Sequence, residues 1–400
     1  MSNKPRVLLV MHKVPLDSGF LAEKFIRLSE QMDVHLLVWD KQENADKFIN
    51  KHKLHTALKK NIHFGYTHYS AILFILQWLV CFISQTRFRQ YIISGDDNLI
   101  QRIKYTLTYL PVSLLQPNIV HFEFGTIAQQ GVIIKSFIDA KLSVSFRGYD
   151  LNYAGIDNSK YYDSVWNQVD GFHFLGNDLK QRAISRGYIP DKIEALIPPA
   201  IDTAFFVASN THKNYEKLQL ISVGRLVWKK GYEYAIRAAL LLKRKGIPFE
   251  YKIIGEGSHR QALEFMIKES GLENQVSLMG ERDAEVIKQE LKQAHIFVHP
   301  AISEGFSNAV LEAQAMGLPV VCTDADGLAE NIADGVTGFI VHKWDEHAIA
   351  TKLEMLWNNR DMMKAMGNAG IGRVQNYFTI EKQIAAFKAF YQKLYSETNS

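Results

Sequence analysis

Cysteine is scarce in this chain of 400 residues, in which only Cys81 and Cys322 occur. Two cysteines so far apart in the sequence form neither a disulfide framework nor the closely spaced ligand pairs of a zinc site. The sequence also shows no signal peptide, because the charged residues near its amino terminus lead directly into the apolar, strand-like residues 7–10. Both features favour the reducing cytoplasm, and we expect a cytoplasmic protein.

A strong excess of charge of either sign is absent as well. The net charge is +4, and Lys and Arg are scattered along the chain rather than gathered in a stripe with aromatic side chains. Such stripes are typical of nucleic-acid-binding proteins, so we expect no nucleic-acid partner. The composition, 47% apolar and 22% charged, is that of an ordinary globular protein. A chain of 400 residues exceeds what one compact core usually supports, so two domains are expected.

No apolar run reaches the roughly 20 residues that a helix needs to span a bilayer. The longest candidate, residues 71–83, is followed by Arg87 and Arg89. Two interpretations of this segment remain open. It can form a helix buried in the protein, or a helix that docks on a membrane surface with Trp78 and the basic residues among the lipid headgroups. The second interpretation adds a peripheral contact, through residues 71–83, with the inner face of the plasma membrane.

Short apolar runs alternate with amphipathic helical stretches along most of the chain. This alternation is typical of βαβ units, in which parallel strands are joined by right-handed crossovers. We expect strands at residues 6–11, 34–39, 118–122, 142–146, 171–175 and 193–197, and then at 218–225, 249–254, 275–278, 296–298, 319–322 and 338–341. Between the two series, residues 208–214 have the polar composition of a linker.

The economical architecture is α/β, with two doubly wound, Rossmann-like domains that face each other across a cleft. We expect the first domain at residues 1–205 and the second at residues 206–376. Ligands of such sheets bind at the carboxyl ends of the strands. Four chemically distinctive residues follow expected strands in this way: Gly19, Arg147, Arg225 and Glu304.

Two carboxylates flank the start of an expected helix late in the chain. Glu304 lies on a loop after an apolar strand, and Ser307 or Asn308 can cap a helix that contains Glu312. A helix start is also an anion-binding site. If both glutamates were helical they would lie about 12 Å apart, beyond the roughly 5–9.5 Å of a glycosidase pair. The arrangement suits an extended ligand with hydroxyl groups on both sides of a diphosphate. The alternative interpretation is that Glu312 lies in the first turn of the helix and only stabilises it, through a favourable interaction with the helix dipole.

A basic turn follows the first expected strand of the second domain. Gly224 allows a ligand to approach the backbone closely, and Arg225 and Lys230 bring two cations to one strand end. The spacing is not that of a Walker loop, and no Ser or Thr follows the lysine. A solvated basic turn is the alternative interpretation. Together with the helix start at Ser307 and Asn308, the turn favours a diphosphate site.

These motifs combine into a known pattern. The run of residues 303–321 resembles the E-x7-E signature of the retaining glycosyltransferases of family 4, in the GT-B group. Residues 223–231 resemble the phosphate-contacting segment of that family, and residues 197–202, 253–257, 327–330 and 334–339 continue the match. The resemblance covers most of residues 195–345, whereas the amino-terminal half matches mainly in pattern. It implies a GT-B fold, whose carboxyl-terminal helix, here residues 377–400, packs back on the amino-terminal domain.

The resemblance also implies roles for individual residues. The first domain would take the acceptor and the second the nucleotide-sugar donor. Arg225 and Lys230 would neutralise the leaving diphosphate, Glu304 would bind the hydroxyls of the donor sugar, and the acceptor would attack on the face that the diphosphate leaves. Neither a metal nor another cofactor is expected. The remaining donor-binding residues would be Gly19, Gly224, Met279, Arg282, Gly305, Phe306, Ser307, Asn308 and Glu312, with Glu312 on the ribose and Met279 and Arg282 near the base.

Two segments depart from the family pattern. The first loop has Asp17-Ser18-Gly19 rather than a Gly-Gly pair. Where many members have His-Gly-x-Asp, this chain has Arg147-Gly148-Tyr149-Asp150. Arg147 stays charged and cannot shuttle a proton at neutral pH, but it can bind an acidic sugar, a phosphate or a carboxylate. We expect a retaining hexosyltransferase that moves a sugar from a UDP- or GDP-sugar to a saccharide or lipid-linked acceptor, in the biosynthesis of cell-surface polysaccharide or glycolipid. A nucleotide-sugar epimerase of this fold and a non-catalytic nucleotide-sugar-binding subunit remain alternatives.

Overall fold

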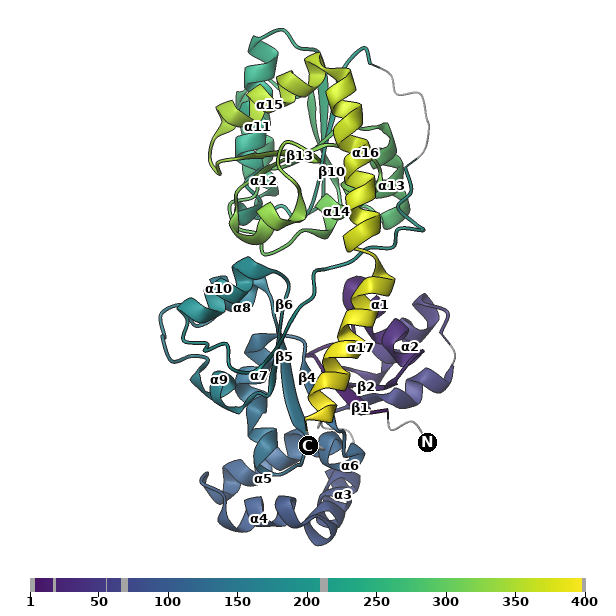
Figure 1. The fold of residues 1–400 in the computed structure, drawn as a ribbon, viewed down its shortest axis with the longest axis vertical. Helices are drawn as coiled ribbons and strands as arrows, with labels where there is room; N and C mark the ends of the chain where they lie inside the picture. The colour runs from purple at the N-terminus through teal and green to yellow at the C-terminus, as the bar shows by residue number, and fades with distance from the viewer. Residues whose placement is uncertain (1–3, 17–18, 55, 66–70, 209–214, 398–400) are drawn as a thin grey trace. The chain divides into compact units, whose positions relative to one another are not determined.

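The structure is a computed structural model that describes residues 4–16, 19–54, 56–65, 71–208 and 215–397 (Figure 1). Asp17 and Ser18 of the first loop, and all but one residue of the expected linker, lie outside these ranges. Contacts between Cα atoms divide the chain into two compact units. The first unit contains residues 1–197 and 384–400, and the second contains residues 198–383.

The first unit is built on a parallel sheet of seven strands in the order β3-β2-β1-β4-β5-β6-β7. The strands are β1 Arg6–Val10, β2 Asp33–Val38, β3 Ile62–Phe64, β4 Ile119–Phe122, β5 Lys141–Phe146, β6 Gly171–Phe174 and β7 Ile193–Leu196. A parallel sheet covered on both faces buries its inner strands, which explains why β1 is apolar from Val7 to Val10 and β4 is apolar except for His121. The six expected strands are present, but the sequence did not predict β3, an edge strand of three residues.

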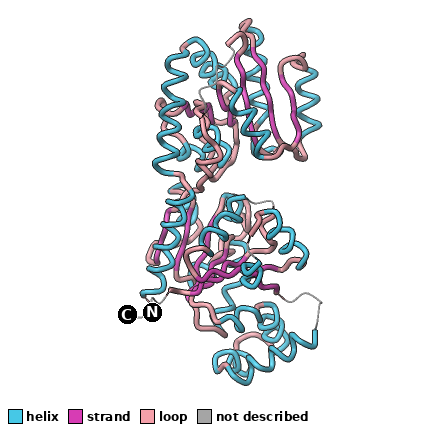
Figure 2. Tube along the Cα trace, turned by 90° about the vertical axis from the view of Figure 1, so that its right-hand side faces the viewer, coloured by secondary structure: helices cyan, strands magenta, loops and turns pink. Residues whose placement is uncertain are grey.

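Helices cover both faces of this sheet (Figures 1 and 2). They are α1 Gly19–Ser29, α2 Gln42–Lys51, α3 Ala71–Ser84, α4 Thr86–Ser94, α5 Leu99–Thr108, α6 Leu110–Leu115, α7 Gly125–Gly131, α8 Gly148–Asn152, α9 Asp163–Gln168 and α10 Asn177–Ser185, with 3-10 turns η1 Thr56–Asn61 and η2 Val132–Ser136. Helices α3 to α6 form a helical insert between β3 and β4. The helix expected over residues 71–83 is therefore α3.

The buried-helix interpretation of α3 is wrong. Its apolar side chains are largely exposed, including Ile72 at 77%, Leu76 at 55%, Val80 at 59% and Ile83 at 72%. No single helix of the described residues is long and apolar enough to cross a membrane. Residues 72–84 and 86–94, bent by 100° relative to each other, together have the length and apolar composition of a broken span.

Trp78, which the second interpretation placed among lipid headgroups, makes contacts within the insert. Its indole Nε1 donates a hydrogen bond to Thr106 Oγ1 at 2.9 Å, and its ring stacks on Phe82. Trp78 is half-buried and meets Phe88 edge-on, so it joins α3 to the rest of the insert. The exposed face of α3 is formed by aliphatic side chains.

The last helix, α17 Ile380–Ser396, joins the first unit from Ile384 onward. Phe387 meets His173 of β6 with ring centres 4.8 Å apart, and Tyr391 meets His121 of β4 at 5.4 Å. The aromatic face of α17 therefore covers polar side chains of the central strands.

The second unit has a parallel sheet of six strands in the order β10-β9-β8-β11-β12-β13. The strands are β8 Leu218–Val223, β9 Phe249–Ile254, β10 Val276–Gly280, β11 Ile296–His299, β12 Val320–Thr323 and β13 Gly338–Val341. Its helices are α11 Tyr232–Arg244, α12 Arg260–Glu269, α13 Ala284–Gln293, α14 Asn308–Ala315, α15 Glu346–Asn358 and α16 Arg360–Tyr377, with 3-10 turns η3 Trp228–Lys230 and η4 Asp326–Asn331. All six expected strands are present.

Side chains of successive strand residues in the second unit enter two separate cores. Ile296 and Val298 of β11 pack in one core, and Phe297 between them packs in the other. This alternation follows the two-residue period of a strand. The sheet is thus held from both faces, which fixes the loops that leave its carboxyl edge.

Candidate functional site

The basic turn after β8 depends on two glycines. Gly224 has φ +156°, and Gly231, at the N-cap position of α11, has φ +62°, a region that side chains other than glycine rarely adopt. A Cβ atom on Gly231 would lie 2.1 Å from the carbonyl oxygen of Pro300. Glycine therefore permits the turn to lie directly against the loop after β11.

Backbone hydrogen bonds join this turn to that loop. The N–H groups of Ile302 and Ser303 both donate to the carbonyl oxygen of Lys229, at 2.8 and 3.2 Å. Within this arrangement the ammonium of Lys230 forms an ion pair with the carboxylate of Glu304. The structure thus brings together the basic turn and the first glutamate of the E-x7-E segment.

Glu304 lies in a strongly charged environment. Burial alone would raise the pKa of its carboxyl, but Lys230 and then His299 outweigh this effect and lower the pKa to about 2. His299 Nε2 lies 3.5 Å from Glu304 Oε2. Glu304 is therefore an anion at neutral pH and can accept hydrogen bonds from hydroxyl groups, but it cannot act as an acid there.

The start of α14 differs from the sequence prediction. Ser307 occupies the N-cap position, but its side chain makes no capping hydrogen bond, and Asn308 is already inside the helix. Asn331 instead fixes the entry, because its amide accepts from the Ser307 N–H at 3.0 Å and donates to the Ser307 carbonyl at 2.8 Å. The first-turn N–H groups of α14 are consequently not covered by a capping side chain of Ser307.

Glu312 lies on α14 and differs electrostatically from Glu304. Its side chain is partly exposed, and burial raises its pKa to about 7. The pKa values of the two glutamates are thus shifted in opposite directions. Glu304 is already charged well below neutral pH, whereas Glu312 gains or loses its proton near neutral pH. Such a divergence is typical of functional sites.

The other predicted donor residues lie at the same edge of the sheet. Gly305 is buried, and the Phe306 ring lies 5.8 Å from that of Phe378. Arg225 and Arg282 are exposed, and Met279 is half-buried near the end of β10. Among the described residues, no hydrogen bond or ion pair joins Met279 or Arg282 to Lys230 or Glu304.

In the first unit, Arg147 is held by a residue that the sequence did not single out. Its Nη2 donates to Glu123 Oε2 at 3.0 Å, and its Nε donates to the Glu123 carbonyl at 3.1 Å. The guanidinium lies 4.5 Å from the centre of the Phe20 ring, next to Gly19. A Cβ on Gly19 would meet no atom within 4 Å, so the described structure does not itself require glycine there.

Glu123 holds a second cation on its other oxygen. Lys24 Nζ donates to Glu123 Oε1 at 2.6 Å, and both side chains are almost fully buried. Burial lowers the pKa of Lys24 to about 8, although Glu123 opposes the shift. His121 Nε2 lies 3.2 Å from the same ammonium. No local sequence pattern predicts this buried group, because Lys24 lies far from His121 and Glu123 in the chain.

Sequence comparisons show that the second unit is similar to a known family. Residues 207–373 match the family model of the group 1 glycosyl transferases. The amylovoran biosynthesis glycosyltransferase AmsK of Erwinia amylovora is 31% identical over 244 residues, 59% of this chain and 60% of that protein. A putative colanic acid biosynthesis glycosyltransferase, WcaL of Salmonella typhimurium, is 30% identical over 221 residues, 53% of this chain and 54% of that protein. The chain thus spans 60% or less of the length of these relatives.

Structural comparison extends the similarity to both units. The crystal structure of Anabaena HepE in complex with UDP aligns with a TM-score of 0.74 and 13% identity, covering 97% of this chain and 100% of that one. The same protein in complex with UDP-glucose gives 0.72 and 14%, covering 98% and 100%. At this identity the likeness shows the fold, which is GT-B with two Rossmann-like units. Residues 207–373 therefore resemble the group 1 glycosyl transferases, within a chain of the GT-B fold.

Proposed function

We propose that this chain is a retaining, metal-independent hexosyltransferase that uses a UDP- or GDP-sugar. The acceptor is a saccharide or a lipid-linked saccharide, and the product contributes to a cell-surface polysaccharide or glycolipid. The observation that carries this proposal is the junction of the Lys230 turn with the Glu304 loop inside the matched domain. The names of AmsK and WcaL, both polysaccharide biosynthesis glycosyltransferases, and the HepE complexes with UDP and UDP-glucose support it.

The donor diphosphate would lie over the basic turn. Lys230 and Arg225 would neutralise it, with Gly224 allowing close approach of the backbone and the first-turn N–H groups of α14 adding donors. Two cations and a helix start can stabilise the departing diphosphate without a metal ion. Since Lys230 is paired with Glu304, donor binding would exchange partners. Lys230 would turn to phosphate and Glu304 to the sugar hydroxyls.

Glu312 would hold the ribose. A partly exposed carboxyl with a pKa of about 7 gains from two hydroxyl donors, because they stabilise its charged form. The base would lie near Met279 and Arg282. The acceptor hydroxyl would attack on the face that the diphosphate leaves, with a phosphate oxygen taking its proton. This route needs no pair of protein acid and base groups, and it accords with the low pKa of Glu304.

Arg147 would serve the acceptor side. Its side chain is 14% exposed, and Glu123 engages its Nε and Nη2 atoms. The remaining guanidinium edge could bind an acidic or phosphate group of the substrate. The exposed aliphatic face of α3 would place the enzyme on the inner face of the plasma membrane.

A panel of nucleotide sugars tests the donor site by thermal shift. We expect one UDP- or GDP-sugar to raise the melting temperature of the wild type and of Glu285→Ala, a control at an exposed position of the same unit. Glu312→Ala should lose the shift. If no nucleotide sugar stabilises the wild type, the donor-site proposal is wrong.

Transfer of labelled sugar to lipid-linked and free oligosaccharides then tests the reaction. We expect a product that retains the anomeric configuration and forms equally well with a chelator present. Tight donor binding without transfer to any acceptor would indicate a nucleotide-sugar-binding subunit. Inversion of the donor sugar without an acceptor would indicate an epimerase.

A further inference from the structure

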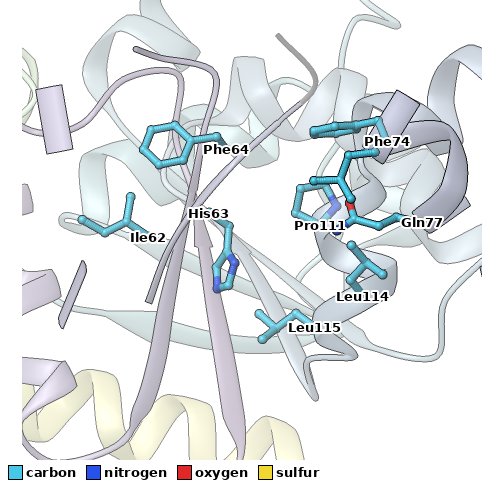
Figure 3. A pocket seen from close by; sticks show the side chains of 9 residues that line it. Ile62, His63, Phe64, Phe74, Gln77, Pro111, Leu114 and Leu115 are labelled. Atoms are coloured by element: carbon cyan, nitrogen blue, oxygen red, sulfur yellow. The ribbon is translucent and has the colours of Figure 1, made fainter. Parts of the chain in front are cut away.

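A pocket of about 420 Å³ lies between the edge strand β3, helix α3 and helix α6 (Figure 3). This volume is within the roughly 300–1,000 Å³ of small-molecule sites. In Figure 3, side chains of β3 form one wall, and side chains of α3 and α6 form the other. Most of the lining is aliphatic or aromatic: Ile62, Phe64, Leu73, Phe74, Leu114 and Leu115.

The described residues that line the pocket offer no charge to a ligand. Its polar lining side chains are Gln77 and His63. Burial is the main cause that lowers the pKa of His63 to about 4, so this imidazole is neutral at physiological pH. His63 Nε2 also hydrogen-bonds to His35 Nδ1 at 2.9 Å. A sugar or a phosphate would find few partners here, whereas a hydrocarbon chain requires none.

The rim of the pocket is continuous with the exposed face of α3. Leu73 and Leu114 line the pocket and are nevertheless 53% and 43% exposed. From Leu73 the apolar surface continues along α3 through Leu76 and Val80, which are 55% and 59% exposed. A hydrocarbon chain lying on this face can enter the pocket without crossing water, which favours a ligand that arrives from a membrane.

The helical insert is also positively charged overall. Residues 71–115 contain four basic residues against two acidic ones, which are Arg87, Arg89, Arg102 and Lys104 against Asp96 and Asp97. Basic residues beside an apolar helix face suit a membrane with anionic headgroups. A second copy of this chain would bring the same excess of charge against itself. The charge therefore favours a lipid surface as the occupant of this face.

We propose that the pocket between β3, α3 and α6 binds the hydrocarbon chain of a lipid-linked saccharide acceptor. The identity of this lipid as the acceptor rests on the proposed function, whereas the binding of a chain can be tested without it. The chain would hold the acceptor at the first unit while the face of α3 lies on the bilayer. Binding of one chain would also raise the local concentration of the saccharide near the enzyme.

Photocrosslinking tests the pocket directly. The probe is farnesyl phosphate with a diazirine at the far end of its chain, carried in vesicles of phosphatidylcholine and phosphatidylglycerol. We expect labelled peptides from β3 and α6 in the wild type. Gln77→Trp fills the pocket and should reduce this labelling at least about tenfold. Ile75→Trp, a control on the exposed face outside the lining, should leave it unchanged.

Several results would overturn the proposal. One is labelling confined to the exposed face of α3, and another is equal loss of labelling in Gln77→Trp and Ile75→Trp. A dimer that excludes the probe would instead assign the face to a second copy. Far-ultraviolet circular dichroism checks the folding of both variants, and Leu114→Trp, at the exposed rim, replaces Gln77→Trp if that variant unfolds.

Kinetics separate this proposal from the proposed function. Gln77→Trp should raise the KM for a lipid-linked acceptor at least about tenfold, while transfer to the chain-free saccharide and donor affinity stay unchanged. An equal effect on both acceptors would contradict the pocket. If no nucleotide sugar binds the wild type but β3 and α6 are labelled, the glycosyltransferase proposal fails and the lipid-chain site stands.

Discussion

Lys230 and Glu304 form an ion pair although 74 residues separate them in the chain. The proposed function assigns them to different parts of one ligand, the diphosphate and the sugar. In the unliganded protein each therefore satisfies the charge of the other in a partly buried place. The ion pair keeps both side chains near the positions in which they would bind the donor. A nucleotide-sugar donor must therefore break this ion pair in order to bind.

Glu304→Gln should separate phosphate binding from catalysis. The substitution frees Lys230, so we expect the affinity for the nucleoside diphosphate to stay equal or to rise. Transfer should fall about 10²–10³-fold, the typical effect of removing one group that stabilises a transition state. Isothermal titration and a labelled-sugar assay measure the two effects. Lys230→Gln is the matched variant and should weaken both. Equal losses of diphosphate affinity in the two variants would contradict the exchange of partners.

Glu312 should make the unliganded protein less stable as pH rises through neutrality. Burial raises its folded-state pKa to about 7, above its ordinary value of 4.5, so the folded state holds its proton more tightly than the unfolded state. The contribution of the Glu312 carboxyl to the free energy of unfolding is fully present below pH 4.5 and is lost as the pH rises to 7 and above. Glu312→Gln should therefore be more stable than the wild type at pH 8 by on the order of 2 kcal/mol, reduced here for partial exposure. Melting temperatures across pH check this, and parallel curves for both proteins would contradict it.

Gly231 should be far less replaceable than another left-handed glycine of the same unit. Gly231→Ala adds a Cβ that would lie 2.1 Å from the Pro300 carbonyl, whereas Gly246, with φ +71°, has no atom within 4 Å of such a Cβ. Both substitutions incur backbone strain of roughly 1 kcal/mol. We expect Gly231→Ala to cost about 1–3 kcal/mol more, through the overpacking term, and to weaken donor binding. Denaturant titrations of the two variants provide the comparison, and similar costs would show that the turn does not depend on this contact.

Much of the fold could be predicted because parallel strands buried on both faces read as continuous apolar runs. The expected strands of both units are present for this reason. Strand β3 was missed because its three residues centre on His63 and carry no such run. The face of α3 could not be settled either, because an apolar sequence predicts a helix but does not reveal what covers it.

Some residues of the candidate site could also be predicted from the sequence, and others could not. Glu304 and Glu312 belong to one local signature, so the sequence locates them together. Lys24 lies on α1, which follows β1, and Glu123 directly follows β4, 99 residues further along the chain; the pairing of β1 with β4 brings them together. Asn331 likewise fixes Ser307 from a distant loop, and the local pattern predicted a capping side chain instead.

Leu76→Glu should release the protein from anionic vesicles. Leu76 is 55% exposed on the face of α3, so a charge there opposes insertion without disturbing the core. Loss of one apolar side chain at a lipid surface corresponds to roughly 1.5–3 kcal/mol, and we expect at least a tenfold weaker vesicle partition. Ile189→Glu is the control, since Ile189 is 71% exposed in the same unit but lies outside the insert. Equal pelleting of both variants and the wild type would contradict membrane contact through α3.

Glu123 should be essential to the stability of the first unit. It holds Lys24 on one oxygen and Arg147 on the other, and Glu123→Gln would leave two neighbouring buried cations without their shared counter-charge. Breaking such a group costs about 3–5 kcal/mol. Asp139→Asn, at an exposed pair with Arg87 in the same unit, should cost roughly 1 kcal/mol or less. Hydrogen exchange of the β5 amides measures the first unit separately from the second.

The pKa of the buried Lys24 provides a second test of the Glu123→Gln prediction. Glu123 opposes the lowering of the Lys24 pKa, so its removal should move that pKa below its present value of about 8. The folded variant would then favour neutral Lys24, and its stability should rise with pH from near neutrality toward the ordinary lysine value of 10.5. Adding Lys24→Met to Glu123→Gln should recover part of the lost stability at pH 7, because one uncompensated cation disappears. If the double variant is as unstable as the sum of the single ones, packing rather than charge holds this group together.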